Sequence, residues 1–463
     1  MKTTTTSRTA VLIASFGASF LTPFMVSSIN IALPTIGREL GIGAVSLSWI
    51  TNAYLLCSTI LLIPFGRLAD MYGRRRFFSA GIVIATVAAF LSIFAQTGPQ
   101  LIAIRLLHGT GAAMIFGTGM AMLTSVYPPQ ERGKILGINV SFVYLGLSLG
   151  PSAGGILTRY FGWQSIFAAV VPVGIAIFFI VTYGIRTEWK QHDNEKFDGI
   201  GALFYGASLA FLLLGFSRLT HFTGKLFAVA GIVCTLLFLK IESRTVQPIL
   251  PIRFFTENRL FAFSNLAAFI NYSATYAVGF LVSFYLQYIK GLSSDKAGLF
   301  MIIQPVIMVL GSPLSGRLSD RYEPRIIAST GMTFTAAGLA LFSTLSFTTP
   351  LPHLAAILIL LGSGFALFSS PNTSAVMGSV DKSEYGIASA TVGTMRLSGQ
   401  VVSMGFITLL ISLIIGEEAI TPDRYPHFLD MMHTAGIIFA LTCTAGIAVS
   451  LVRGAVRPVK AGG

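Results

Sequence analysis

The stretch GRLADMYGRRR occupies residues 66–76, and GRLSDRYEPRI occupies residues 316–326. We call them the first and the second cassette. Both read Gly-Arg-Leu and then place an aspartate four residues after the glycine, and they lie 250 positions apart (316 − 66). Each cassette follows one long apolar run and precedes another, which indicates a repeated unit of helices.

The composition is that of a membrane protein. Of 463 residues, 54% are hydrophobic and only 11% are charged, whereas a soluble domain has about 25% charged residues. The apolar runs reach about 20 residues, which is enough to cross the hydrocarbon core of a bilayer. The net charge of +13 is explained by basic cytoplasmic loops, and we expect no nucleic-acid partner.

Hydropathy and turn residues predict fourteen membrane spans. They are 10–33, 46–66, 77–95, 100–123, 134–157, 165–185, 199–219, 224–241, 259–287, 296–316, 325–346, 353–376, 386–415 and 430–452. With the N-terminus in the cytoplasm, 22 of the 31 Lys and Arg residues lie in cytoplasmic segments. We therefore expect both termini to be cytoplasmic, in a multi-pass protein of the plasma membrane.

The repeat extends beyond the cassettes. Gly133 and Gly386 each follow a polar turn with an acid and open a new span, and they lie 253 positions apart (386 − 133). The predicted fold is an all-α integral membrane protein of 14 transmembrane helices, with two pseudo-symmetric six-helix bundles and an inserted helix pair. Its predicted parts are an N-terminal bundle (1–185), the inserted pair with flanking loops (186–250) and a C-terminal bundle (251–463).

Several stretches resemble the major facilitator superfamily. The first cassette is similar to its signature loop. LIAIRLLHGTGAA (101–113) is similar to its fourth-helix motif, and GLSLGPSAGG (146–155) to the fifth-helix motif of its antiporters. Five further stretches resemble the fourteen-helix drug:proton antiporter branch of this superfamily: INIALP (29–34), SWITNAYLL (48–56), QPILPIRFF (247–255), FYLQYIKGLSSDKAG (284–298) and SATVGTMRLSGQ (389–400). The resemblance runs over nearly the whole chain.

The sequence departs from that branch at one position. The first helix of the branch usually carries an acid a few residues before the Asn-x-Ala-Leu-Pro run, and Met25 stands at the matching position here. None of the 18 acidic residues lies in the middle of a predicted span. The residue that would replace this proton-coupling carboxylate stays open.

Each cassette is interpreted as a latch at the inner mouth of a transporter. The glycines permit tight turns and close backbone approach, and the aspartate suits a helix N-terminus or a neighbouring arginine. The latch residues are Gly66, Arg67, Asp70, Gly73, Arg74, Gly316, Arg317, Asp320 and Arg321. Because Glu323 and Pro324 replace Gly-Arg, we expect the first latch to be the stronger. The alternative is that the cassettes are simple basic anchors.

The fifth span contains Gly146, Gly150, Pro151, Gly154 and Gly155. Glycines spaced four apart form a groove for a neighbouring helix, and the proline can bend the span. The resemblance implies an antiporter helix 5 that seals and hinges; the alternative is generic small-residue packing.

Two cations lie inside spans, and charges there usually mark function. Arg105 and Arg396 are therefore proton-coupling candidates, as is His108, because histidine titrates near neutral pH. The alternatives are that Arg105 extends to the membrane surface and that His108 is a neutral, hydrogen-bonded residue.

The first and fourth spans of each half are expected to line the substrate cavity, with amides from spans 2 and 10. The candidates are Met25, Ser28, Asn52, Met114, Asn271, Tyr272, Tyr276, Gln304, Ser369 and Asn372. Aromatic, methionine and amide side chains suit an amphipathic ligand, and two nearby arginines favour a neutral or anionic one.

These features predict a secondary active transporter that works by alternating access, with proton-coupled, multidrug-type export of amphipathic compounds. The alternative is a facilitator or importer of a metabolite without proton coupling. No catalytic motif occurs, so we expect no enzyme, cofactor or metal site. Cys57, Cys234 and Cys443 lie far apart in apolar runs and are interpreted as packing residues, and a monomer is expected.

Overall fold

The computed structural model describes residues 7–190, 197–245, 248–250, 252–381 and 384–454, and for residues 129, 130, 132–134, 320 and 385–387 it describes the backbone alone. Within these ranges the secondary structure is helical, with no β-strand. Several helices begin at a polar residue whose side chain accepts a backbone N–H: Ser7, Thr97, Asp198 and Asn258 do so.

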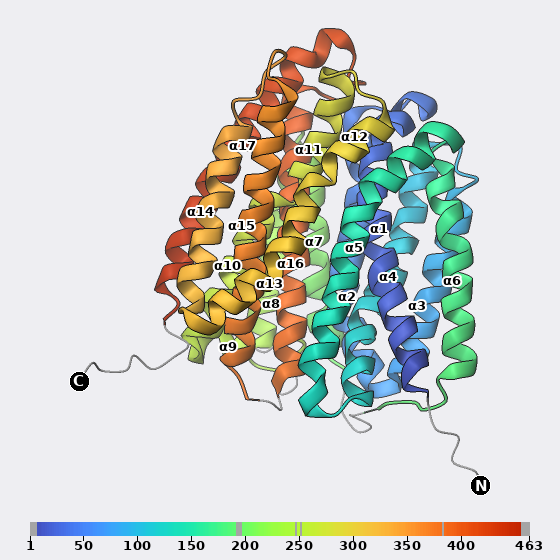
Figure 1. Cartoon of the computed structure of the whole chain (residues 1–463), viewed down its shortest axis with the longest axis vertical. Helices are drawn as coiled ribbons and strands as arrows, with labels where there is room; N and C mark the ends of the chain where they lie inside the picture. The colour runs from blue at the N-terminus through green and yellow to red at the C-terminus, as the bar shows by residue number, and fades with distance from the viewer. Residues whose placement is uncertain (1–6, 191–196, 246–247, 251, 382–383, 455–463) are drawn as a thin grey trace. The chain divides into compact units, whose positions relative to one another are not determined.

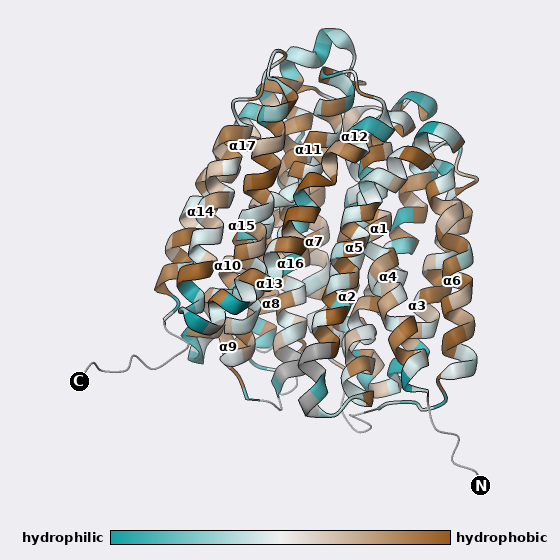
Figure 2. Ribbon diagram, in the orientation of Figure 1, coloured by the Kyte–Doolittle hydropathy of each residue, from teal (hydrophilic) through white to brown (hydrophobic). Residues whose placement is uncertain are grey.

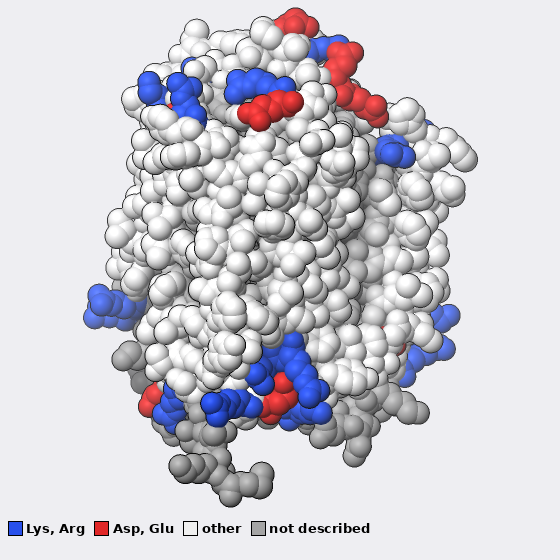
Figure 3. Space-filling view, turned by 90° about the vertical axis from the view of Figure 1, so that its right-hand side faces the viewer, with Lys and Arg blue, Asp and Glu red and all other residues white. Residues whose placement is uncertain are grey.

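Fourteen helical segments of the described residues are long and apolar enough to cross a membrane. The predicted number of spans and the all-α class are thereby confirmed. Figure 2 shows the long apolar stretches of these helices and the more polar residues toward their ends. On the face drawn in Figure 3, charged side chains gather at two ends and leave a broad band between them without charge. Such a band suits the hydrocarbon core of a bilayer, and the chain is a multi-pass membrane protein.

Two compact units divide the chain. Unit 1 contains Met1–Ile249, Gly291–Leu299 and Glu417–Ala419; unit 2 contains Leu250–Lys290, Phe300–Gly416 and Ile420–Gly463. Unit 1 holds α1 (Arg8–Leu40), α2 (Ala44–Tyr72), α3 (Arg74–Ser92), α4 (Gly98–Val126), α5 (Pro129–Phe161), α6 (Gln164–Gly184), α7 (Gly199–Ser217) and α8 (Phe222–Glu242). The helices are labelled in Figure 1.

Unit 2 begins after the inserted pair. It holds α9 (Ile252–Glu257), α10 (Arg259–Thr275), α11 (Val278–Phe284), the π-helical turn η1 (Tyr285–Ile289), α13 (Ile303–Arg321), α14 (Pro324–Phe342), α15 (Leu351–Gly378), α16 (Tyr385–Ile414), the 3₁₀ turn η3 (Pro422–Arg424) and α17 (Tyr425–Val452). The short α12 (Ser294–Met301) starts in unit 1 and ends in unit 2.

The same packing scheme recurs in the two units. In unit 1, α4 packs against α2 and α3, α1 against α5 and α6, and α3 against α6. In unit 2, α15 packs against α13 and α14, α10 against α16 and α17, and α14 against α17. Helices α13, α14 and α15 therefore hold in unit 2 the places of α2, α3 and α4.

Close helix contacts repeat at matching glycines. A side chain at Gly81 would strike the carbonyl oxygen of Gly111, and one at Gly331 would strike that of Gly364. The first glycines of these pairs lie 250 positions apart (331 − 81), and the second lie 253 apart (364 − 111). These are the spacings of the two cassettes and of Gly133 and Gly386, so the sequence repeat is also a repeat of helix packing.

The inserted pair, α7 and α8, packs on itself and on α2. Gly215 of α7 lies against the backbone of Ala228 in α8. The hydroxyl of Tyr205 donates to the carbonyl of Thr59 in α2 at 3.2 Å. This pair thus adds two membrane helices to the side of unit 1.

Two predicted spans are interrupted. The span expected at 259–287 breaks after α10, where the N–H of Ala277 donates to Ser403 Oγ of α16 at 3.1 Å instead of to the helix. The span expected at 296–316 breaks between α12 and α13. Pro305 lacks an N–H, so it cannot donate to the carbonyl of Met301 four residues earlier, where α12 ends.

Candidate functional site

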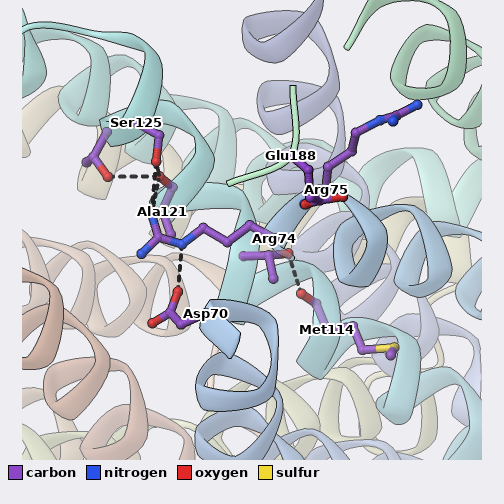
Figure 4. A network of polar contacts seen from close by, with 9 residues as sticks. Asp70, Arg74, Arg75, Met114, Ala121, Ser125 and Glu188 are labelled. Carbon is purple, nitrogen blue, oxygen red and sulfur yellow. Dashed lines mark hydrogen bonds and ion pairs between the residues drawn. The ribbon is translucent and has the colours of Figure 1, made fainter. Parts of the chain in front are cut away.

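The first cassette joins α2 to α3 through Gly73, whose φ of +125° is unfavourable for other residues. Arg74 Nε pairs with Asp70 Oδ1 at 2.6 Å. Arg74 Nη1 donates to Ser125 Oγ at 2.9 Å and to the carbonyl of Ala121 at 3.4 Å, both in α4. Figure 4 shows this arrangement. One buried guanidinium therefore ties the ends of α2, α3 and α4 together.

Glu188 is a partner of this cassette that the sequence did not reveal. It lies in the segment after α6, where its Oε1 accepts the backbone N–H of Arg75 at 2.8 Å. Its Oε2 lies 3.7 Å from Arg76 Nε, and Figure 4 shows Glu188 beside Arg75. The carboxylate caps the N-terminus of α3, where the helix dipole favours an anion. No local pattern links it to the cassette, which lies more than a hundred residues earlier.

The other residues of the first cassette lie at its helix ends. Gly66 lies against Gly117 of α4, where their backbones approach closely. Arg67 is half-buried in α2. The structure thus brings the five predicted latch residues of this cassette together at one end of α2, α3 and α4, and their role as a latch stays a prediction.

The second cassette has a different set of contacts. Gly316 is half-buried near the end of α13, Arg317 and Arg321 are exposed, and the side chain of Asp320 lies outside the described residues. Pro324, which stands in the position of Arg74, opens α14. This cassette therefore lacks the buried arginine of its own that ties the first one to its fourth helix.

A buried polar cluster lies between α2 and α4 of unit 1. Arg105, only 1% exposed, donates through Nε to the carbonyl of Ile50 at 3.2 Å. Its Nη1 lies 3.1 Å from His108 Nδ1. Its guanidinium lies 4.4 Å from the centre of the Tyr54 ring, and Tyr54 meets the His108 ring edge-on at 5.6 Å. The alternative that Arg105 extends to the surface is wrong, since α2 supplies its partners inside the unit.

The glycines of α5 form a contact surface for α1. A side chain at Gly146 would strike the Phe20 carbonyl, one at Gly150 would strike Ser27, and one at Gly154 would strike Ser28. The hydroxyl of Ser28 donates to the carbonyl of Gly150 at 2.9 Å, and Pro151 lies inside the helix. The next glycine, Gly155, faces the segment 291–299 instead: its carbonyl accepts from Ser294 Oγ at 3.1 Å.

The remaining unit 1 candidates are buried in the helix packing. Met25 and Asn52 are 1% and 0% exposed. Met114 of α4 contacts α3 at Gly81 and is half-buried. Ser28 is already hydrogen-bonded to α5, so its hydroxyl supports the contact between helices. Near Asn52, Thr51 donates to Asn30 Oδ1 of α1 at 3.3 Å.

In unit 2, Arg396 of α16 lies over the ring of Tyr272 in α10, 5.3 Å from its centre. Asn271 is fully buried in α10, and among the residues that the structure describes neither its Oδ1 nor its Nδ2 has a hydrogen-bond partner. A buried amide without partners is costly, which makes Asn271 the candidate that most needs a ligand or water. Of the other predicted residues, Tyr276 directly follows α10 and Gln304 lies in α13, and both are half-buried. Ser369 is buried in α15.

Asn372 is engaged within unit 2. Its Nδ2 donates to the carbonyl of Ser264 in α10 at 3.1 Å. Its Oδ1 accepts from Arg453 Nη1 at 2.8 Å. The sequence predicts that Arg453 lies in the basic cytoplasmic tail, yet it is 1% exposed. The side chain turns inward because Asn372 offers a buried acceptor.

Comparison with known proteins points to one family. The family model described as Major Facilitator Superfamily matches residues 15–404 and residues 264–461. The riboflavin transporter RibZ of Clostridioides difficile (strain 630) is 31% identical over 380 residues, 81% of this chain and 82% of RibZ. The multidrug transporter protein MdtP of Bacillus subtilis (strain 168) is 28% identical over 444 residues, 94% of this chain and 80% of MdtP.

Solved structures agree on the fold. The crystal structure of a bacterial homolog of the human lysosomal transporter Spinster, in an inward-facing and occupied conformation, matches with a TM-score of 0.66. The match covers 96% of each chain at 15% sequence identity, so it bears on the fold alone.

Proposed function

Since this chain belongs to the major facilitator superfamily, we propose that it is a secondary transporter that exports amphipathic small organic compounds by alternating access, coupled to protons. The observation that carries the proposal is the repeat of cassette and helix packing in the two units. Two equivalent six-helix sets are what a transporter with two alternating states requires. Two relatives that are named as export proteins, for cephamycin and for tetracenomycin C, support the direction of export.

The charges inside the spans suggest the substrate class. Among the described residues, acids lie toward the span ends, as Asp70 does in α2, while Arg105 and Arg396 lie inside α4 and α16, several residues from either end. A cation would meet no carboxylate there, so we propose a neutral or anionic substrate. Tyr272 beside Arg396 and the unpartnered amide of Asn271 supply the aromatic and polar contacts that such a ligand uses.

His108 is the proposed proton carrier of unit 1. It contacts Arg105 and Tyr54 in the buried cluster, and Met25 supplies no carboxylate on α1. The imidazole is the group of this cluster that can bind a proton and release it again. We place the protein in the plasma membrane with both termini in the cytoplasm, as the basic loops favour.

A second function is favoured by two observations. The relative RibZ is named a riboflavin transporter, and Met25 stands where the antiporter branch usually has an acid. Together they support a facilitator or importer of a vitamin-like metabolite without proton coupling.

Transport into proteoliposomes separates the two functions. The purified chain is reconstituted, a pH gradient is imposed or collapsed, and a panel of anionic, neutral and quaternary-ammonium compounds is offered with riboflavin among them. Gradient-driven accumulation of anionic or neutral amphiphiles supports the first function. Riboflavin movement that ignores the gradient supports the second, and quaternary ammonium ions as the best substrates would refute the proposed substrate class.

A further inference from the structure

In each unit, a charged residue that follows the sixth helix of the six-helix set returns to the cassette region of the same unit. In unit 1 the segment after α6 brings Glu188 to the start of α3. In unit 2 the segment after α17 brings Arg453 to the interior, next to Asn372 of α15. Because α15 holds the place of α4, Glu188 reaches the third helix of its set and Arg453 reaches the fourth, both near the cassette.

The partners of Arg453 correspond to those of Arg74. Arg74 reaches from α3 to Ser125 and Ala121 near the end of α4. Arg453 reaches from the end of α17 to Asn372 in the second half of α15, which is the equivalent helix. Both guanidinium groups are buried, at 7% and 1% exposure. Each unit thus holds one buried arginine that donates to its fourth helix at the cassette end.

The second cassette has no arginine at the position that matches Arg74, and an acid stands just before that position. The position of Arg74 is held by Pro324 (74 + 250), and that of Gly73 by Glu323. Burial lowers the pKa of Arg453 to about 10, the charge of Glu323 opposes this shift, and Arg325 adds to it. Arg453 is therefore cationic at neutral pH, and Glu323 is close enough to act on it. The Nε and Nη2 groups of Arg453 have no partner within the described residues, so two donors are available to an acid.

We propose that Arg453 is a positioning residue that completes the second cassette, supplying from the end of α17 the buried guanidinium that Pro324 cannot supply. The charges are exchanged between the units. At the matching positions 73–74 and 323–324, unit 1 carries Arg74 and unit 2 carries the acid Glu323. The returning segment carries the acid Glu188 in unit 1 and Arg453 in unit 2. This role is separate from substrate choice and from proton coupling.

Hydrogen–deuterium exchange on the purified full chain in detergent tests the proposal without any substrate. In Arg453→Gln, we expect amides of residues 316–326 to exchange at least about tenfold faster, while those of 66–76 stay unchanged. The rescue variant adds Glu323→Gly and Pro324→Arg, which rebuilds the Gly-Arg of the first cassette. We expect it to return exchange at 316–326 to the rate of the unmodified chain.

The matched control is Arg244→Gln, which removes an exposed arginine after α8 and should change neither segment. Unchanged exchange at 316–326 in Arg453→Gln would overturn the proposal. So would a rescue variant that folds but exchanges as fast as Arg453→Gln, because a general loss of packing at α17 cannot be repaired from the cassette. If Arg453→Gln alone fails to fold, a folded rescue variant supports the proposal, and an unfolded one refutes it.

Discussion

Two ion pairs of the same spacing differ in their surroundings. Asp70 and Arg74 lie at 2.6 Å, and Arg253 and Glu257 at 2.7 Å, each pair four residues apart. The Arg74 side chain is 9% exposed, whereas that of Arg253 is 82% exposed. Exposed pairs contribute little to stability, while a buried charge that loses its partner is costly. Only the first pair is therefore in a position to control the arrangement of helices.

Asp70→Asn should abolish transport with little loss of expression. The amide keeps the shape of the carboxylate but removes the charge that Arg74 faces, so the tie between α2, α3 and α4 weakens. We expect the rate in proteoliposomes to fall at least about tenfold, the effect of about 1.4 kcal/mol. Glu257→Gln is the control, since it removes the same charge from the exposed pair, and it should transport normally. Normal transport by Asp70→Asn would contradict the latch.

Arg105→Lys should also lower transport, although it keeps the positive charge. The planar guanidinium of Arg105 contacts the Ile50 carbonyl, His108 and the Tyr54 ring at once, and a lysine ammonium cannot reproduce this geometry. We expect at least about a tenfold loss of rate with an unchanged elution volume in size-exclusion chromatography. Arg218→Lys, on the loop between α7 and α8, should be neutral. Full activity of Arg105→Lys would show that the charge alone matters.

Some site residues could be predicted from the sequence, and others could not. Asp70 and Arg74 belong to one short motif, so their spacing on the chain already indicates that they meet. Glu188 and Arg453 come from segments far from their partners, and no local pattern connects them. Arg453 also looks like an ordinary basic tail residue, because its burial depends on Asn372, which lies 81 residues away.

Helix α5 depends on its glycines at the face toward α1. Gly154 is buried, and a Cβ there would lie 2.7 Å from Ser28 Cα. Gly137 lies on the same helix, is exposed and has nothing within 4 Å of such a Cβ. The helix thus offers one glycine that the packing requires and one that it does not.

Gly154→Ala should destabilise the protein, and Gly137→Ala should not. Overpacking of a tight helix contact typically costs about 1–3 kcal/mol. Alanine at an open helical position is favoured over glycine by about 0.5–1 kcal/mol. Thermal unfolding in detergent, followed by intrinsic fluorescence, should therefore show a lower midpoint for Gly154→Ala and an equal or higher one for Gly137→Ala. Equal midpoints for Gly154→Ala and the unmodified chain would show that α1 can move aside.

At the scale of elements, hydropathy predicts where helices lie but not where they break. The number of spans follows from apolar runs of sufficient length. The break after α10 arises because Ser403 of α16 takes the amide of Ala277, a contact between helices that lie far apart in the sequence. Such a contact leaves no trace in the pattern of apolar residues.

The whole molecule has a predicted topology that can be measured directly. In a chain whose three cysteines are replaced, Ala419→Cys between α16 and α17 should react with a membrane-impermeant maleimide added to intact cells. Tyr72→Cys in the first cassette, where the side chain is 57% exposed, should react only after the membrane is opened. The reverse pattern would place both termini outside the cell.

Coupling of substrate transport to a proton gradient can be measured directly. Proteoliposomes containing the purified chain are loaded with a fluorescent anionic amphiphile, and its movement is followed after a pH jump that creates or removes the proton gradient. We expect the amphiphile to move against its own gradient when protons flow the other way, and we expect this movement to be lost in Asp70→Asn. Movement that only runs down the substrate gradient, whatever the pH difference, would contradict the proposed coupling.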